Sequence, residues 1–262
     1  MEKSLTLRFA ATRNHAALFV THAPDGKLRA YVRYYLEALS HHGIRPVLIV
    51  ASDKKVGQLD GAFLSRLNGL YVRQNLGYDF GAWAHILRDD PNLFNAETLY
   101  LINDSTIGPL NNRKFEELLL RVRSSTKDLI GLTDSYERQW HIQSYFLALK
   151  GSALSSSALR SFLGRIKNLS AKNDVINAYE MPFATFLENG GLSCEVLFPA
   201  KKAHNPTLAE WRALLRIGLP FVKVAALRES SSLFFDKLAW RRSLQAEGFD
   251  YRLVEEALSS GS

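Results

Sequence analysis

Short apolar runs alternate with stretches of helical periodicity through the first half of the chain. Ala16–Thr21 is apolar and contains β-branched and aromatic residues, which is typical of a buried strand. After the turn at Pro24–Gly26, hydrophobic residues recur at helical spacing from Leu28 to Leu39. The alternation continues, and it predicts further strands at 46–51, 70–73, 98–102, 129–132 and 142–149 and helices at 80–87 and 115–122.

This order of elements predicts an α/β fold in which a mainly parallel central sheet is flanked by helices. In such folds ligands bind at the carboxyl ends of the strands. The second half is more helical, with helices expected at 152–167, 174–187, 208–217 and 233–257 and one strand at 193–198. We therefore expect one principal domain over residues 1–228 and a helical C-terminal extension over residues 229–262.

Composition narrows the class of protein. Hydrophobic residues make up 47% of the 262 positions, which is enough for a sizeable core. The single cysteine, Cys194, excludes an intramolecular disulfide and favours a reducing compartment. No apolar run is long enough to span a bilayer, and Met1–Arg13 lacks the apolar centre of a secretory signal. We expect the chain to be cytoplasmic.

Positive charge is concentrated near the C-terminus. The net charge is +7, and the stretch from 201 to 242 holds nine Lys and Arg residues against three Asp and Glu residues, a surplus of six. Such a surplus suits an anionic partner, for example a diphosphate, an acidic lipid surface or nucleic acid. From charge alone, a solvated helix face is the simpler explanation.

A segment with two glycines lies between a predicted strand and a predicted helix at 75–81 (NLGYDFG). Its glycines would let the backbone approach a ligand closely, and Asp79 can accept hydrogen bonds from a ribose or a base. The glycine spacing differs from that of a dinucleotide-binding fingerprint. The alternative is an ordinary helix N-terminus in which Asp79 is the cap.

A second polar segment directly follows the strand at 98–102, where Asn103, Asp104 and Ser105 lead into the Gly108–Pro109 turn. A carboxylate at the end of a strand can hold a divalent cation that neutralises a leaving diphosphate. An Asx-type turn that closes the strand explains the same residues without a ligand. The segment by itself leaves both possibilities open.

Polar residues also mark the predicted strands at 129–132 and 142–149. In chain order they are Thr133, Asp134, His141, Gln143, Ser144 and Tyr145. Strand alternation puts the odd-numbered residues of the second strand on one face and the even-numbered residues on the other. The polar face is suited to line a cleft and bind sugar hydroxyls, whereas an edge strand with one wet face is the simpler alternative.

Three residues of the second half are further candidates. Pro182 indicates that a helix begins near it, which would leave Glu180 on the preceding loop, where a carboxylate can act as a general base. The alternative is that Glu180 only complements the helix dipole. His204 is a candidate metal ligand, although a lone histidine is more often neither ligand nor catalyst. Lys223 can steady a diphosphate as a point charge.

Four groups of residues, taken together and in this order, resemble the rhamnan synthesis F family of bacterial polysaccharide glycosyltransferases. They are Asn75–Trp83 (NLGYDFGAW), Asn103–Pro109 (NDSTIGP), Gly131–Thr133 (GLT) with His141–Phe146 (HIQSYF), and Pro220–Lys223 (PFVK). The resemblance extends from residue 16 to residue 230, approximately. The combination is specific for the family and unspecific for the sugar.

The resemblance implies a GT-A-like fold, a nucleotide-sugar donor such as dTDP-rhamnose, and a growing, lipid-linked glycan acceptor. Asn103 to Ser105 occupy the place of the Asp-x-Asp motif of GT-A enzymes. The last position is a serine here, which leaves a single carboxylate for a divalent cation, Mn²⁺ or Mg²⁺.

The family also implies roles for the candidate residues. We expect the donor nucleotide and its diphosphate to be bound by Asn75, Gly77, Asp79, Asn103 and Lys223, the metal by Asp104 and His204, and the substrate by Thr133, His141, Gln143 and Ser144. Glu180 is the expected general base of a direct displacement, and Asp134 is the second choice.

Two other functions stay open at this point. Ser105 in place of an acid is compatible with a non-catalytic glycan-binding or scaffold subunit that has a degenerate transferase fold. The basic C-terminal stretch is compatible with nucleic-acid binding, but no known nucleic-acid motif is present, so we expect no nucleic-acid partner.

The basic stretch also predicts contact with a membrane. Basic and aromatic side chains together suit the headgroup region of an anionic bilayer. The candidates are Phe234, Phe235, Lys237, Trp240, Arg241 and Arg242. Binding there would bring the cleft to a lipid-linked acceptor, so we expect a peripheral protein on the inner face of the bacterial cytoplasmic membrane.

Overall fold

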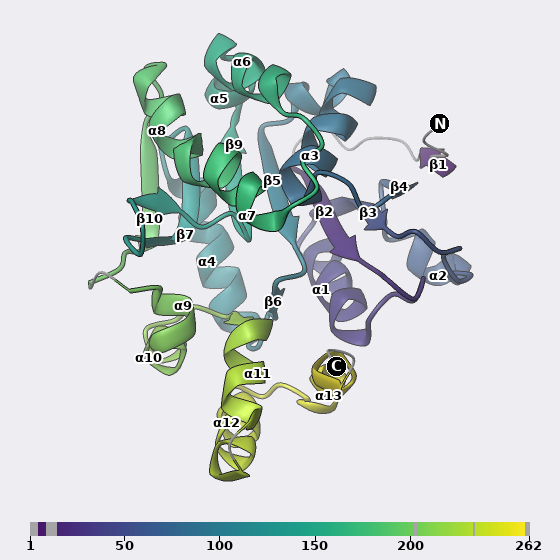
Figure 1. Ribbon diagram of the computed structural model, residues 1–262, viewed down its shortest axis with the longest axis vertical. Coiled ribbons are helices and arrows are strands. Elements are labelled where there is room, and N and C mark those ends of the chain that lie inside the picture. Colours follow the sequence, from purple (N-terminus) through teal and green to yellow (C-terminus); the bar gives the residue numbers. More distant parts are fainter. Residues whose placement is uncertain (1–4, 9–14, 202–203, 233, 260–262) are drawn as a thin grey trace.

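The computed structural model describes residues 5–8, 15–201, 204–232 and 234–259, and its centre is a nine-stranded sheet (Figure 1). The strands are β1 (Leu5–Arg8), β2 (His15–His22), β3 (Arg45–Ala51), β4 (Gly69–Arg73), β5 (Thr98–Asn103), β7 (Leu129–Ser135), β8 (His141–Ile142), β9 (Phe146–Lys150) and β10 (Cys194–Phe198). Their order in the sheet is β1-β4-β3-β2-β5-β9-β7-β10, and β8 pairs with β7.

The sheet is mixed, although most of its strands point the same way. β4, β3, β2 and β5 are parallel neighbours, and β7 is parallel to β10. β9 lies between β5 and β7 and is antiparallel to both. The expected α/β class is confirmed, but the sheet is not purely parallel. The reason is that only a short hairpin, without a crossover helix, connects β7 through β8 to β9.

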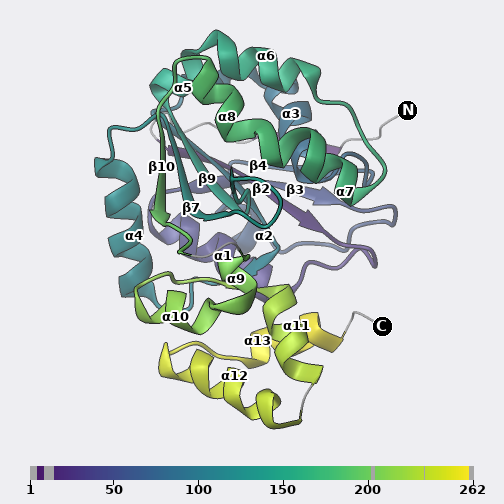
Figure 2. The same ribbon diagram turned by 60° about the vertical axis from the view of Figure 1, so that its left-hand side comes forward.

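Helices cover both faces of the sheet, and a hydrophobic cluster lies under each layer (Figure 2). One layer holds α3 (Tyr78–Asp89), α5 (Gly151–Ser155), α6 (Ser157–Arg165), α7 (Lys172–Val175) and α8 (Met181–Asn189). The other holds α1 (Ala30–His41), α2 (Gly61–Leu64), α4 (Asn112–Ser124) and α10 (Trp211–Arg216). α3 and α1 follow strands, and each buries the apolar stripe that the sequence predicts.

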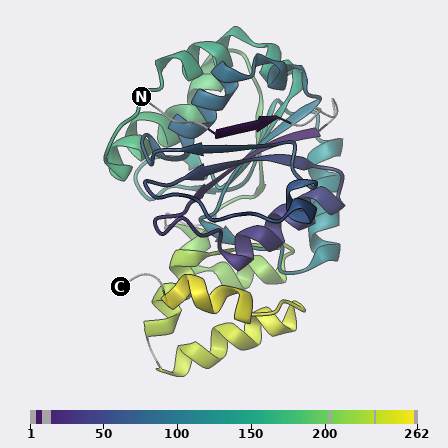
Figure 3. The ribbon, with the colours of Figure 1, turned by 90° about the vertical axis from the view of Figure 1, so that its right-hand side faces the viewer.

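The C-terminal helices form a further group beside α1 (Figure 3). They are α11 (Val224–Ser232), α12 (Phe234–Ala246) and α13 (Arg252–Ser259). The single helix expected at 233–257 is therefore two helices, because Gly248 has φ 83° and turns the chain after α12. Phe249 meets the ring of Tyr34 in α1 at 5.2 Å, and the boundary expected at residue 228 lies within α11.

A two-residue bulge interrupts the strand expected at 142–149. Asp134 pairs with Ile142 and Gly131 pairs with Leu147, so five steps along the partner strand oppose three steps along β7. Residues 143–145 are consequently outside the regular ladder. Bulges of this kind redirect side chains and backbone groups, often next to functional sites.

The helix expected at 174–187 contains a π-helical turn. α7 continues into the π turn Ile176–Glu180 and then into α8 without a loop. Glu180 is therefore the residue at the junction of the π turn and α8, whereas the sequence predicted a loop position. Pro182 has no N–H to donate four residues back, and the wider turn accommodates the missing bond.

The side chains predicted to contact a membrane differ in their exposure to solvent. Trp240 is only 2% exposed and packs in the core, so its ring does not face solvent. Arg241 pairs with Glu255 at 2.7 Å, while Arg242 is exposed. The side chains of Phe234, Phe235 and Lys237 lie outside the described residues. Within the described part of the chain, no helix is both long and apolar enough to cross a membrane.

Candidate functional site

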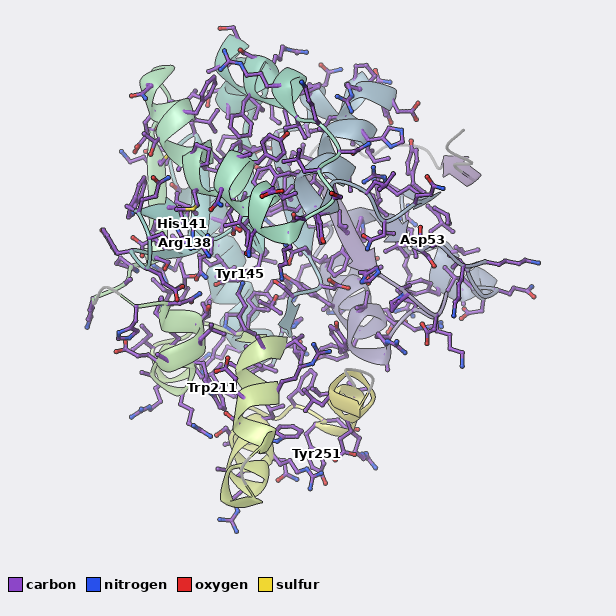
Figure 4. All side chains as sticks on the ribbon, viewed as in Figure 1. Asp53, Arg138, His141, Tyr145, Trp211 and Tyr251 are labelled. Atoms are coloured by element: carbon purple, nitrogen blue, oxygen red, sulfur yellow. The ribbon has the colours of Figure 1, made fainter. Side chains whose placement is uncertain are left out.

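The family-like segments meet at the carboxyl edge of the sheet, although they are far apart in sequence. Asn103 ends β5, and its amide donates to Asp79 Oδ2 at the start of α3 at 2.7 Å. β6 (Thr106–Ile107) pairs with β11 (Val222–Lys223), which brings Lys223 to the same place. The bulge after β8 contributes further residues to this group. Figure 4 labels Tyr145 of this bulge, Arg138 and His141 of the preceding hairpin, and Asp53 after β3.

Asp79 is a partly buried carboxyl group with a raised pKa. Besides Asn103, the backbone N–H of Phe80 donates to it at 3.1 Å. Burial, followed by repulsion from Glu180, raises the pKa of Asp79 from 3.8 to about 6, although the two hydrogen bonds oppose the change. Asp79 therefore changes charge close to neutral pH.

Glu180 is held at the opposite side of the site by the bulge. Its Oε1 accepts hydrogen bonds from the backbone N–H of Ser144 at 2.9 Å and from the Ser144 hydroxyl at 2.8 Å. Because Ser144 lies outside the regular ladder, its N–H is available for a side chain instead of a strand partner. Two bonds to one oxygen fix the carboxylate and leave its other oxygen for a ligand.

Lys223 completes a group that we call the charged cluster: Asp79, Asn103, Ser144, Glu180 and Lys223. The Lys223 ammonium lies 5.1 Å from the centre of the Tyr145 ring. Burial lowers the pKa of Lys223, and the negative charges of Glu180 and Asp79 act in the opposite direction. The five side chains come from five places in the sequence, and all five are among the predicted site residues.

Asp104 lies beside the charged cluster at the end of β5. Its Oδ2 accepts from the Thr21 hydroxyl at 2.7 Å and from the His22 N–H at 2.9 Å, while its backbone C=O accepts from the Tyr31 hydroxyl at 3.1 Å. Burial raises the pKa of Asp104, and the bonds from Thr21 and His22 offset part of the effect. These three partners were not predicted, although Thr21 and His22 end the central strand β2, a position that marks ligand sites in α/β folds.

The donor set around Asp104 is thin for a divalent cation. Magnesium is usually bound by one or two carboxylates together with water and substrate phosphates. Asp104 offers one carboxylate, and two donors already occupy one of its oxygens. His204, the second predicted ligand, is 3.2 Å from Glu210. Among the described residues, no three His, Cys, Asp or Glu side chains are grouped as a metal site would require.

Asn75 is connected to two residues that the sequence did not single out. Its side-chain amide is 3.1 Å from His22 Nε2, and its backbone N–H donates to Asp53 at 3.4 Å. Asp53 follows β3, so Asn75, His22 and Asp53 stand at the ends of three adjacent parallel strands. They form a polar rim next to Asp104.

The need for a glycine at position 77 is explained by packing within the chain. Gly77 has φ 74° at the N-cap of α3, and a Cβ atom there would lie 2.5 Å from Asn168 Oδ1 and 3.0 Å from Asn168 Cα. Its N–H donates to the Leu169 carbonyl at 3.1 Å. The close backbone approach that the sequence predicted for a ligand is thus occupied, at this glycine, by the segment around Asn168.

Two of the four predicted substrate-binding residues, Thr133 and Gln143, belong to a second group, the neutral network: Thr133, Gln143, Tyr145, Asn205 and Thr207. Thr133 Oγ1 is 2.7 Å from Gln143 Oε1 and 3.0 Å from the Tyr145 hydroxyl. The Gln143 amide donates to Asn205 at 3.2 Å and to Thr207 at 3.3 Å. Thr133 is 0% and Gln143 3% exposed, so these polar groups satisfy one another inside the protein.

His141 and Asp134 also have partners within the chain. His141 Nδ1 is 3.0 Å from the Gln139 carbonyl. Asp134 is 3% exposed, and its two oxygens accept from the Trp140 indole N–H at 2.9 Å and from the Ala200 N–H at 2.6 Å. Both carboxylate oxygens of Asp134 therefore hold structural elements in place, whereas Glu180 keeps one oxygen available.

The chain is similar in sequence to a known protein. The Virulence protein VirA of Vibrio anguillarum, also recorded for strain ATCC 68554 / 775, is 25% identical to the chain over 194 residues. The match covers 60% of this chain and 62% of the relative, so the chain spans less than two thirds of the length of that protein.

The family comparison covers more of the chain. The model of the family described as rhamnan synthesis protein F matches residues 48–239. That span includes the whole charged cluster, Asp104 and the polar rim residues Asp53 and Asn75. The match extends over more than half of the 262 residues, and the chain therefore belongs to the rhamnan synthesis protein F family.

Proposed function

We propose that the chain is a glycosyltransferase with a GT-A-like fold that moves a sugar from a nucleotide-sugar donor to a glycan acceptor in polysaccharide synthesis. The charged cluster carries the proposal, because it combines a fixed carboxylate, Glu180, with a half-buried ammonium, Lys223, at the carboxyl edge of the sheet. Membership of the rhamnan synthesis protein F family supports a role in polysaccharide synthesis.

The donor nucleotide occupies the polar rim in this proposal. In this proposal Asn75 and Asp53 bind the base or ribose, and the Asn103 amide holds Asp79 at the adjacent helix start. The diphosphate then extends past Asp104 toward Lys223. dTDP-rhamnose is the first donor to test, and the acceptor is a lipid-linked glycan presented at the cytoplasmic face of the membrane.

Glu180 is the general base in this proposal. Its free oxygen takes the proton of the acceptor hydroxyl while that hydroxyl attacks the anomeric carbon, and the bond from that carbon to the diphosphate breaks. Ser144 holds the carboxylate in one orientation. The ammonium of Lys223, which interacts electrostatically with Glu180, favours the negative charge that develops on the leaving group.

The proposal is tested by a donor screen followed by a turnover assay. Purified protein is heated with dTDP-, UDP- and GDP-sugars, and the donor that raises the melting temperature most is incubated with extracted lipid-linked glycan. We expect nucleoside diphosphate to be released and the glycan to gain one sugar. Glycan binding without release from any donor would contradict the proposal and favour a scaffold subunit.

A further inference from the structure

The segment of residues 166–171, which we call the strap, is bonded to both carboxyl sides of the charged cluster. It connects α6 to α7 without regular secondary structure (Figure 2). Near its beginning, the Lys167 N–H donates to the Tyr179 hydroxyl at 2.8 Å, and that hydroxyl donates to the Lys167 carbonyl at 3.3 Å. Tyr179 is the residue before Glu180, so this part of the strap is attached next to Glu180.

The later part of the strap is attached to the glycine-containing segment before Asp79. The Gly77 N–H donates to the Leu169 carbonyl at 3.1 Å. The Tyr78 hydroxyl donates to the Ser170 carbonyl at 3.3 Å. Because Tyr78 is the residue before Asp79, a tyrosine hydroxyl bonds the strap next to each of the two carboxyl groups.

The backbone of Tyr78 is strained in a way that this attachment explains. Tyr78 has φ 53°, a left-handed conformation that a residue with a Cβ atom adopts rarely and at a cost. Glycine would relieve the strain but has no hydroxyl to donate to Ser170. Such strain persists only where surrounding contacts hold it, and the bonds from Gly77 and Tyr78 to the strap are contacts of this kind.

The middle of the strap fits against the same segment through Asn168. Its Oδ1 accepts from the guanidinium of Arg73, at the end of β4, at 3.3 Å. A Cβ atom at Gly77 would lie 2.5 Å from this oxygen, and one at Gly81 would lie 2.9 Å from it. Both glycines therefore make room for Asn168, which seats the strap at one place on the start of α3.

The two attachment points also meet in the core beneath the strap. Phe80 follows Asp79, and its ring centre lies 6.2 Å from that of Tyr179 and 5.6 Å from that of Phe183 in α8. The start of α3 and the π turn consequently form one packed unit. Most residues of the strap are exposed, so the strap joins the two parts of this unit on its solvent side.

We propose that the strap fixes the position of Asp79 relative to Glu180 through the hydroxyl groups of Tyr78 and Tyr179. Both tyrosines are positioning residues, because each acts through the carboxyl group that follows it. In the proposed function Asp79 lies on the donor side and Glu180 takes the acceptor proton, so their separation affects how donor and acceptor meet. The effect on turnover rests on the proposed function, whereas the connection between the two sides does not.

Hydrogen exchange in the full chain tests the connection without any substrate. Tyr179→Phe keeps the ring and loses both bonds to Lys167. It is read at the Gly77 N–H, which Tyr179 does not contact and which is bonded to the far part of the strap. We expect exchange at Gly77 to become about fivefold faster or more, the scale of one or two hydrogen bonds.

The reciprocal substitution is read at the opposite side. Tyr78→Phe loses the bond to Ser170 and is followed at the Ser144 N–H, which donates to Glu180. We expect faster exchange there as well. Tyr34→Phe, at a half-buried tyrosine of α1, is the matched control and should change neither site. Faster exchange confined to the neighbourhood of each substituted tyrosine would overturn the inference.

Turnover with dTDP-rhamnose, or the donor found in the screen, and extracted lipid-linked glycan is the second arm. Each tyrosine variant should lower kcat by about tenfold and leave the KM of the donor within about twofold. Because both hydroxyls act through one strap, Tyr78→Phe/Tyr179→Phe should lose little more than the more impaired single variant.

The outcomes separate the strap from the proposed function. Losses of kcat that multiply in the double variant, or faster exchange at both far sites without any loss of kcat, would contradict the positioning role. If exchange is transmitted along the strap and no donor is turned over by the unmodified chain, the connection stands and the proposed function is wrong.

Discussion

The charged cluster and the neutral network lie side by side and are built from consecutive residues of one bulge. Ser144 donates to Glu180 in the charged cluster, whereas its neighbours Gln143 and Tyr145 meet at Thr133 in the neutral network. The neutral network consists of uncharged side chains that satisfy one another in the interior. The charged cluster holds two carboxyl groups and an ammonium that perturb one another.

The difference separates a structural role from a functional one. Neutral polar groups that are fully bonded rigidify a core at little electrostatic cost. Buried charges are expensive, and a protein that retains them next to a free carboxylate oxygen places them where a ligand can complete the arrangement. Substitutions in the two groups should consequently have different effects: on turnover in the charged cluster and on stability in the neutral network.

The largest effect is expected for Glu180→Gln. Glutamine keeps the shape and the acceptor for Ser144 but cannot take a proton, so turnover should fall by about two orders of magnitude while donor affinity and unfolding stay the same. Glu188→Gln, at an exposed glutamate of the same helix, is the control. Near-normal turnover in Glu180→Gln would remove Glu180 from the role of base, and Asp134 would be tested next.

Thr133→Val should act on stability instead. Valine has nearly the same shape but no hydroxyl, so Gln143 and Tyr145 lose a buried partner, and unfolding should become easier by about 1–3 kcal/mol. The measurement is urea denaturation, with Thr126→Val at an exposed position as the control. A large loss of turnover without any loss of stability would show that Thr133 contacts substrate and would break the comparison.

Asp79 predicts a pH dependence of folding stability. Its pKa is about 6 in the folded chain and 3.8 as a free group, so the folded state holds the proton to higher pH, and stability should decline as the pH rises from about 4 to about 6. Full shielding would make this decline roughly 3 kcal/mol, and the partial exposure of Asp79 reduces it to about 1–2 kcal/mol.

Asp79→Asn tests that dependence. The variant cannot ionise at this position, so its stability should vary less with pH than that of the unmodified chain over the same interval. The measurement is the denaturation midpoint at a series of pH values. If the denaturation midpoints of the two proteins changed with pH in the same way, the pKa of Asp79 would not be raised in the folded state.

Ser144→Ala is expected to give the smallest effect. It removes the hydroxyl bond to Glu180 and retains the backbone N–H bond, so turnover should fall about threefold to tenfold, the scale of one hydrogen bond. Ser161→Ala, at an exposed position of α6, is the control. A loss as large as that of Glu180→Gln would mean that the hydroxyl contacts substrate directly.

Several members of the charged cluster could be recognised from the sequence because polar residues at strand ends stand out against apolar strands. Asn103 follows an apolar run, and Asp79 opens a helix after a strand. The polar rim was harder to find, since His22 and Asp53 sit in segments that carry no motif.

The amino-acid pattern was enough to predict the alternation of strands and helices, the apolar stripes of α1 and α3, and most residues of the charged cluster, because each depends on local periodicity or on a strand end. Long-range packing, in contrast, sets the position of the bulge at which Ser144 donates to Glu180 and the pairing of β6 with β11 that positions Lys223. These features arise from pairing between residues far apart in the chain, as with Ser144 and Glu180 or Lys223 and Thr106. Local periodicity contains no information about such pairing, because the register is set only when the hydrophobic faces pack against each other.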